Sequence, residues 1–221
     1  MRSIRHPFTG RLRRASVTAS VSLTVALLSA CAAAHASAAT SGLDQVATTH
    51  PPKPIEDFEL TNQEGKPFRF SQLRGAPALV FFGFTHCPDV CPSTLAKLAL
   101  LTDSADLRLR STALVMVSVD GDRDTPSVMK AYLAQVSPRC IGLTGAPHTV
   151  RDIAAQFSAV FFKGFPDKPG GPYLVQHTTQ IYLVDRQGRL RATFLDASID
   201  AMRRAAAAIA DEQQGPASAA P

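Results

Sequence analysis

An unbroken apolar run from Pro77 to Phe84 constrains this chain more than any other stretch, because two closely spaced cysteines follow it. Such a run predicts a strand that is buried on both faces of a sheet. Cys87 and Cys91 lie in the short loop after it, and apolar residues at helical spacing follow from Pro92. A strand, a cysteine loop and a helix start in this order predict a redox or soft-metal site in an α/β domain.

Strands and helices are predicted to alternate along the rest of the chain. Thr125 is expected to cap the helix that begins at Pro126. The predicted strands are 55–60, 67–70, 77–84, 113–119, 140–143, 180–184 and 191–195. One helix is predicted to begin at Pro92, and three more are predicted at 126–136, 147–159 and 199–213. The order resembles the thioredoxin fold, with strands between helices and a final hairpin and helix. The predicted fold class is therefore α/β, a thioredoxin-like fold with a central mixed sheet and an N-terminal hairpin extension.

Composition divides the chain into four parts. Residues 1–31 are predicted to be a signal peptide or membrane anchor. Residues 32–54 are rich in Ala, Ser and Thr and then in Pro, which predicts a flexible tether. A single folded domain is expected over 55–213, and a disordered tail of small residues over 214–221.

The N-terminal part predicts export. Arginines are followed by uncharged residues from Ala15 to Ala34, which is typical of a secretory signal. The segment Leu28–Cys31 resembles a bacterial lipobox, whose cysteine is lipidated, so Cys31 is the predicted lipidation site. Cleavage near Ala36 or Ala38 and retention as an anchor are the alternatives. All three place the domain on the periplasmic side of a bacterial membrane.

The net charge of +5 does not indicate a nucleic-acid partner. Five of the 23 basic residues lie within residues 1–30, where there is no acidic residue: Arg2, Arg5, Arg11, Arg13 and Arg14. The 18 basic residues that remain balance the 18 acidic ones. The exported domain therefore lacks the basic footprint that nucleic-acid binding requires.

The cysteine count favours a reactive pair over a disulfide scaffold. If Cys31 carries lipid, the odd number Cys87, Cys91 and Cys140 remains in an oxidising compartment. Cys140 begins a buried strand and is interpreted as a small core residue. The close pair is then available for redox chemistry or for a metal.

The position of the pair suits both uses. Pro92 is predicted at the first helical position, with Cys91 at the N-cap and Cys87 in the preceding loop. The positive end of the helix is expected to stabilise a thiolate there. Three intervening residues allow a disulfide, and they also leave room for a bridging metal, so spacing alone leaves both open.

A third ligand is predicted from topology. His177 lies in a loop that enters the strand 180–184, and in a thioredoxin-like sheet that strand begins beside the cysteine loop. His177 is therefore a candidate metal ligand, with a solvated loop histidine as the alternative. His86 is expected to point away from the sulfurs, and His148 to face solvent.

Two motifs closely resemble the Sco (SenC) family. Gly83–Pro92, with the sequence GFTHCPDVCP, matches its signature, and Ser118–Pro126 is similar to the segment that follows its next strand. His177 matches the position of the family's third ligand. The resemblance covers about 55–210 and implies copper, as Cu(I) or Cu(II), bound by Cys87, Cys91 and His177.

Membership would imply a function in building the binuclear copper centre of cytochrome c oxidase. The expected protein is a membrane-tethered metallochaperone whose partner is the copper-site subunit of the oxidase. Another copper chaperone or a thioredoxin-like reductant would be further partners. A thiol-disulfide oxidoreductase that carries no copper is the alternative, with Cys87 and Cys91 as its redox-active pair. A peroxide-reducing enzyme is disfavoured because the peroxiredoxin pattern Pro-x-x-x-Thr-x-x-Cys is missing from this loop.

Three details stay outside this interpretation. Gln176 stands where the family usually has an acidic residue before the histidine. Asp120, Asp122 and Asp124 have the spacing of a calcium loop, but the glycine and glutamate that such a loop needs are missing, so a capped turn is expected. Phe161, Phe162 and Phe165 are expected in the core, with a docking surface as the alternative.

Overall fold

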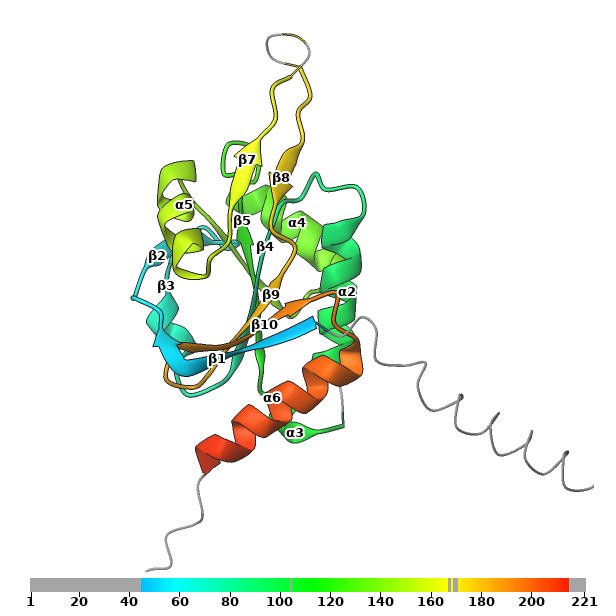
Figure 1. The fold of residues 1–221 in the computed structure, drawn as a ribbon. Coiled ribbons are helices and arrows are strands. Elements are labelled where there is room, and N and C mark those ends of the chain that lie inside the picture. Colours follow the sequence, from blue (N-terminus) through cyan, green and yellow to red (C-terminus); the bar gives the residue numbers. More distant parts are fainter. Residues whose placement is uncertain (1–44, 104, 167, 169–170, 215–221) are drawn as a thin grey trace, which may run out of the picture. The chain divides into compact units, whose positions relative to one another are not determined.

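The computed structural model describes residues 45–103, 105–166, 168 and 171–214 (Figure 1). Its sheet is built outward from β4 (Ala78–Gly83), the strand predicted from the apolar run, and all six residues of β4 are buried. The other strands of this sheet are β1 Gln45–Pro54, β2 Glu59–Asn62, β3 Pro67–Arg69, β5 Ala113–Ser118, β6 Cys140–Thr144, β9 Ile181–Val184 and β10 Arg189–Leu195. Within the described residues, the strand order is β1-β10-β9-β4-β5-β6-β2-β3.

The sheet is mixed, as predicted. β4, β5 and β6 are parallel, because a helix connects each to the next. β9 pairs with β4 in the antiparallel direction, and β10 and β1 follow toward that edge. The N-terminal hairpin of β2 and β3 joins the other edge through β6. The chain therefore has the thioredoxin-like α/β fold.

Helices cover both faces of the sheet. They are α2 Val90–Thr102, α3 Leu107–Arg110, α4 Pro126–Val136, α5 Pro147–Gln156 and α6 Ile199–Gln214, with a 3₁₀ turn, η1, at Phe70–Leu73. Side chains alternate along β4, so that Phe82 packs against Phe157 at the end of α5 while Gly83 faces Cys91 of α2. α2 and α5 thus lie on opposite faces, with α4 beside α2 (Figure 1).

The first predicted boundary does not hold. Residues 45–54, which composition placed in a tether, form β1 and pair with β10 at an edge of the sheet. The pairing register shifts between Thr48 and Lys53. The prolines of this segment are the reason that the sequence did not predict a strand here. Proline is tolerated at such an edge or bulge because no neighbouring strand needs its missing amide.

Helix α2 begins earlier than predicted. It starts at Val90 with Asp89 as N-cap, so Cys91 lies inside the first turn and not at the cap. The cap of α4 is confirmed, because Thr125 accepts a hydrogen bond from the amide of Val128.

A second, two-stranded sheet was not predicted at all. β7 (Phe161–Lys163) pairs with β8 (Val175–His177) in a hairpin that extends beyond the main sheet (Figure 1). The Gly- and Pro-rich sequence between the two strands is typical of a loop, so the sequence predicted no strand on either side of it. This hairpin carries His177 on its second strand.

The predicted signal segment with Cys31, the first part of the tether and the tail from 215 onward lie outside the described residues. Among the helices that are described, none is both long enough and apolar enough to cross a membrane.

Candidate metal centre

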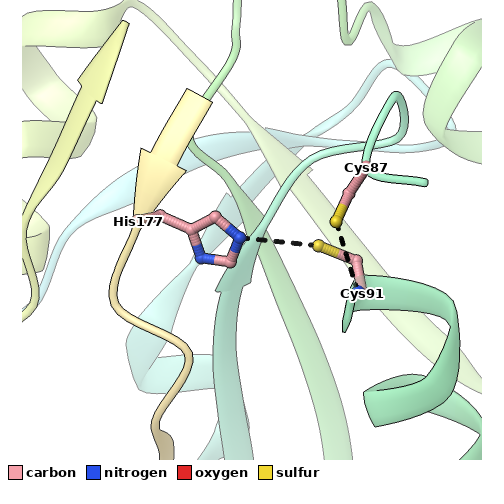
Figure 2. Close-up of side chains that lie close together, drawn as sticks. All are labelled: Cys87, Cys91 and His177. Carbon is pink, nitrogen blue, oxygen red and sulfur yellow. Dashed lines mark hydrogen bonds between the residues drawn. The ribbon is translucent and has the colours of Figure 1, made fainter. Parts of the chain in front are cut away.

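Cys87, Cys91 and His177 converge at the amino end of α2 (Figure 2). Their three ligand atoms lie within 4.8 Å of one another. The amide of Cys91 donates to Sγ of Cys87 at 3.4 Å, and Sγ of Cys91 lies 3.7 Å from Nε2 of His177. The structure therefore brings together all three residues that the sequence selected.

The two thiols differ in their surroundings. Cys87 is half-buried, whereas Cys91 is fully buried, and both are free. Burial raises the pKa of Cys91 far above its usual range, and the neighbouring Cys87 and Asp124 add to the effect. The sequence predicted a helix end that stabilises a thiolate in this loop, and burial opposes that effect at Cys91. The first-turn amide points at Cys87 instead.

Gly83 makes room for the buried thiol. A Cβ atom at this position would lie 3.1 Å from Sγ of Cys91 and 2.6 Å from the ring of Phe81. Both contacts are closer than a packed interior accepts without rearrangement. The glycine at the end of β4 is therefore what lets the sulfur lie directly against the sheet.

The His177 ring is oriented by its neighbours. Nδ1 lies 3.0 Å from the carbonyl oxygen of Thr178, and a carbonyl only accepts, so Nδ1 carries the proton and donates. Nε2 then presents a lone pair toward Cys91. The rings of Phe81 and Phe84 pack edge-on against the imidazole, at centroid distances of 6.0 and 5.7 Å.

Burial also keeps this imidazole neutral. It lowers the pKa of His177 below the ordinary value, although the hydrogen bond to Thr178 and the backbone of Phe82 oppose the shift. A neutral imidazole is the form that binds a metal. The alternative of a freely solvated loop histidine does not hold.

The chemistry of the donor set is soft. Two sulfurs and one imidazole nitrogen suit Cu(I), and Cu(II) or Zn²⁺ to a lesser degree. The same two sulfurs are close enough in the chain to form a disulfide. The geometry is compatible with both uses, and the histidine has a direct purpose only in the first.

Comparison with known proteins gives the family. The model of the SCO1/SenC family matches residues 46–212. This chain is a member of the SCO1/SenC family. A SCO2-like protein of Rickettsia prowazekii is 35% identical over 142 residues, which cover 64% of this chain and 69% of the relative.

Solved structures of SCO1/SenC proteins have the same fold. ScoI of Bradyrhizobium japonicum, solved with copper bound, is 34% identical with a TM-score of 0.61, covering 71% of this chain and 97% of that one. A SCO1/SenC family lipoprotein of Bacillus anthracis is 28% identical with a TM-score of 0.63, covering 73% of this chain and 98% of that one.

The remaining histidines of the described domain lie outside this centre. His148 is exposed, as expected. His86 is exposed too, and its Nδ1 lies 3.0 Å from Oγ1 of Thr85 and 3.6 Å from a carboxylate oxygen of Asp124. The expectation that His86 points away from the sulfurs agrees with these contacts.

The prediction for the aromatic segment is partly wrong. Phe161 belongs to the core, but Phe162 is 67% exposed and Phe165 is 99% exposed. They border an apolar groove of about 810 Å³ that Arg151 and Lys163 flank. Alternation along β7 explains the exposure of Phe162 beside the buried Phe161, whereas Phe165 lies beyond the end of the strand. Cys140, by contrast, is buried in the core as predicted.

Proposed function

We propose that this SCO1/SenC protein is a copper chaperone that holds copper through Cys87, Cys91 and His177 and delivers it to the binuclear copper site of cytochrome c oxidase. The observation that carries the proposal is the approach of a neutral imidazole Nε2 to a buried thiol, 3.7 Å away, at a dithiol loop. A copper-bound relative of the same fold and the family resemblance support copper as the cargo.

Loading requires the thiols to lose protons. Cys91 is a neutral thiol in the free protein, so binding of Cu(I) displaces its proton to solvent and leaves a thiolate ligand. His177 needs no such change because its Nε2 lone pair is already available. The amide of Cys91 stabilises charge on the Cys87 sulfur.

Delivery is a ligand exchange. Thiols of the acceptor replace Cys87 and Cys91 one at a time, and the protons that the acceptor gives up return to the two sulfurs. An external disulfide that accepts two electrons from the pair would be reduced to two thiols and leave Cys87 and Cys91 as a disulfide, so that both thiolate ligands are lost and the site is emptied. A supplying chaperone and a thioredoxin-like reductant would then restore the loaded form.

We place the protein on the periplasmic side of a bacterial membrane, tethered through Cys31 or an uncleaved anchor. The lipobox-like segment supports this placement, as does the existence of a family lipoprotein in Bacillus anthracis.

The second candidate is a thiol-disulfide oxidoreductase. Its dithiol would pass two electrons and two protons to a disulfide of the oxidase subunit and become a disulfide itself. The favouring observation is the half-buried Cys87, which receives an amide hydrogen bond and is the accessible sulfur of the pair. This function gives His177 no direct task.

The test is a titration of the full chain, reduced in detergent without oxygen, with Cu(I) against a competing chelator. We expect tight one-to-one binding that is lost in Cys87→Ser/Cys91→Ser. His177→Ala should bind more weakly by over about tenfold, yet retain disulfide exchange. His148→Ala is the matched control and should bind normally, since this histidine is exposed outside the site. Binding indifferent to His177 would favour the oxidoreductase.

A further inference from the structure

The loop between β5 and α4 contacts both sides of the candidate metal centre. It contains three aspartates, and each one bonds to a different part of the fold. Asp124 bonds to the cysteine loop, Asp120 to the segment that leads into β8, and Asp122 to Lys163 of β7. A turn that only caps α4 would not need these contacts, because the capping hydrogen bond of α4 is accepted by the side chain of Thr125.

Asp124 fixes the cysteine side. Its carboxylate is 0% exposed and accepts from the amide of Thr85 at 3.0 Å and from the hydroxyl of Thr85 at 2.6 Å. Thr85 lies two residues before Cys87. A second hydroxyl, from Ser118 at the end of β5, donates to the same carboxylate at 2.6 Å. The start of the cysteine loop is thereby tied to the central sheet.

Asp120 fixes the histidine side. Its buried carboxylate accepts from the hydroxyl of Tyr173 at 2.7 Å and from Nε of Arg123 at 2.5 Å. Arg123 in turn donates to the carbonyl of Tyr173 at 3.0 Å, with its guanidinium 3.8 Å from the centre of the tyrosine ring. Tyr173 lies four residues before His177, so these bonds hold the chain that enters β8.

The two sides are linked to each other. Arg123 also lies 6.0 Å from the ring of Phe84, which packs against His177. The hydroxyl of Ser118 accepts from the amide of Asp120 and donates to Asp124. Each carboxylate nonetheless bonds to its own side of the centre, Asp120 to Tyr173 and Asp124 to Thr85.

The loop backbone is packed closely against a neighbouring loop at Gly121. A Cβ atom on Gly121 would lie 2.0 Å from the carbonyl oxygen of Gly145, because the two backbones are packed together. Buried carboxylates are costly unless they are fully hydrogen-bonded, and these two are bonded to the chain segments that deliver the ligands.

We propose that Asp120 and Asp124 are positioning residues: together they set the separation between the imidazole of His177 and the sulfurs of Cys87 and Cys91. This inference rests on the proposed copper site. Asp120 acts through the histidine and Asp124 through the cysteines. Asp122 is not assigned a positioning role. Its ion pair with Lys163 joins two half-exposed side chains, and such pairs contribute little to stability.

A double-mutant cycle on the full chain tests the assignment of each aspartate. Asp120→Asn should weaken Cu(I) binding by about tenfold, as changes around metal ligands typically do. In a His177→Ala background the same substitution should change binding less than about twofold, because the ligand it positions is gone. Asp124→Asn should weaken binding in both backgrounds. Asp122→Asn is the matched control, with less than about twofold change in either.

A milder variant guards against misfolding. Tyr173→Phe removes only the hydroxyl that reaches Asp120 and keeps the ring under Arg123. It should weaken binding in the same direction as Asp120→Asn and should also lose its effect without His177. Equal losses with and without His177, for either variant, would show a general loss of structure and overturn the proposal.

A metal-free measurement separates this inference from the proposed function. With ¹⁵N-labelled histidine, Asp120→Asn and Tyr173→Phe should shift the ring signals of His177 in the copper-free protein, whereas Asp122→Asn should not. Unchanged signals would overturn the positioning role whatever copper does. Shifted signals in a chain whose Cu(I) binding ignores His177 would refute the copper site but uphold the positioning of the side chain.

Discussion

Nε2 of His177 lies 3.7 Å from Sγ of Cys91, although 86 positions separate the two residues in the chain. Strand pairing accounts for the approach. β9 pairs with β4, with Ile181 opposite Phe81, so the segment just before β9 must pass the cysteine loop just after β4. Because α2 and His177 lie on the same face of β4, the thiol and the imidazole meet there.

The burial of the thiols predicts an order of alkylation. An alkylating reagent attacks thiolates that it can reach. Cys87 is half-buried, while Cys91 and Cys140 are inaccessible, and burial raises the pKa of Cys140 to about 12. In the folded, metal-free protein, Cys87 should therefore react at least about tenfold faster than the other two. Peptide mapping by mass spectrometry measures this order.

Copper loading supplies the control for that order. Cu(I) should protect Cys87 and leave the slow reaction of Cys140 unchanged, since Cys140 lies in the core on β6. Reaction of Cys91 before Cys87 would contradict the description of the site.

Gly83→Ala should disturb the site through packing. The new methyl group would press on the ring of Phe81 and on Sγ of Cys91. Overpacking of this kind typically destabilises by about 1–3 kcal/mol, and here it should also weaken Cu(I) binding by about tenfold. Thermal unfolding and chelator competition give the two quantities.

Gly142→Ala is the matched control for this substitution. Its methyl group would press on Leu133 and Met129, on a strand that lies two strands from β4. We expect a comparable loss of stability and normal copper binding. Equal copper defects in both variants would mean that binding reports only on general stability.

The apparent affinity for Cu(I) should rise with pH through the neutral range. The pKa of Cys91 is raised, so this thiol is protonated there and its proton must leave when copper binds. The Cys91 proton alone contributes about a tenfold stronger apparent affinity per pH unit, so the slope should be at least that steep.

His177 should not steepen this dependence. Its pKa is lowered, so the imidazole is already neutral at pH 7 and above and competes with no proton there. Titrations at pH 7 and pH 8 measure the slope, and His177→Ala should keep it. An affinity that does not change with pH would contradict a neutral Cys91 thiol in the free protein.

Gln176→Asp should leave copper binding nearly unchanged, within about twofold, as expected of an exposed charge. Side chains alternate along β8, so Gln176 is exposed while Val175 is buried and His177 turns toward the site. An acidic residue here would point away from the sulfurs. Chelator competition on Gln176→Asp and Gln176→Ala checks this, and a tenfold gain with Asp alone would show that residue 176 does reach the metal.

The local pattern of the sequence was sufficient for the centre of the fold. The apolar run predicted β4, and the thioredoxin-like order of elements was enough to place His177 beside the cysteines. β1 was missed because its prolines argue against a strand in general and only pairing at an edge makes them acceptable. The start of α2 was two residues late because Pro92 suits the first turn as a whole.

Long-range contacts were beyond the sequence. The spacing of Asp120, Asp122 and Asp124 was visible, yet their partners lie up to 53 positions away, at Thr85, Lys163 and Tyr173. The burial of Cys91 was equally hidden, because the charge at a helix end can be read from a pattern but the desolvation of one sulfur cannot.

X-ray absorption at the copper K edge of the Cu(I)-loaded full chain tests the central claim most directly, because it counts the atoms bound to the metal. The proposed site predicts two sulfurs and one imidazole nitrogen, with the imidazole signal lost in His177→Ala and kept in His148→Ala. A spectrum without imidazole in the unmodified protein, or one that keeps its imidazole in His177→Ala, would contradict the assignment of His177 as the third ligand.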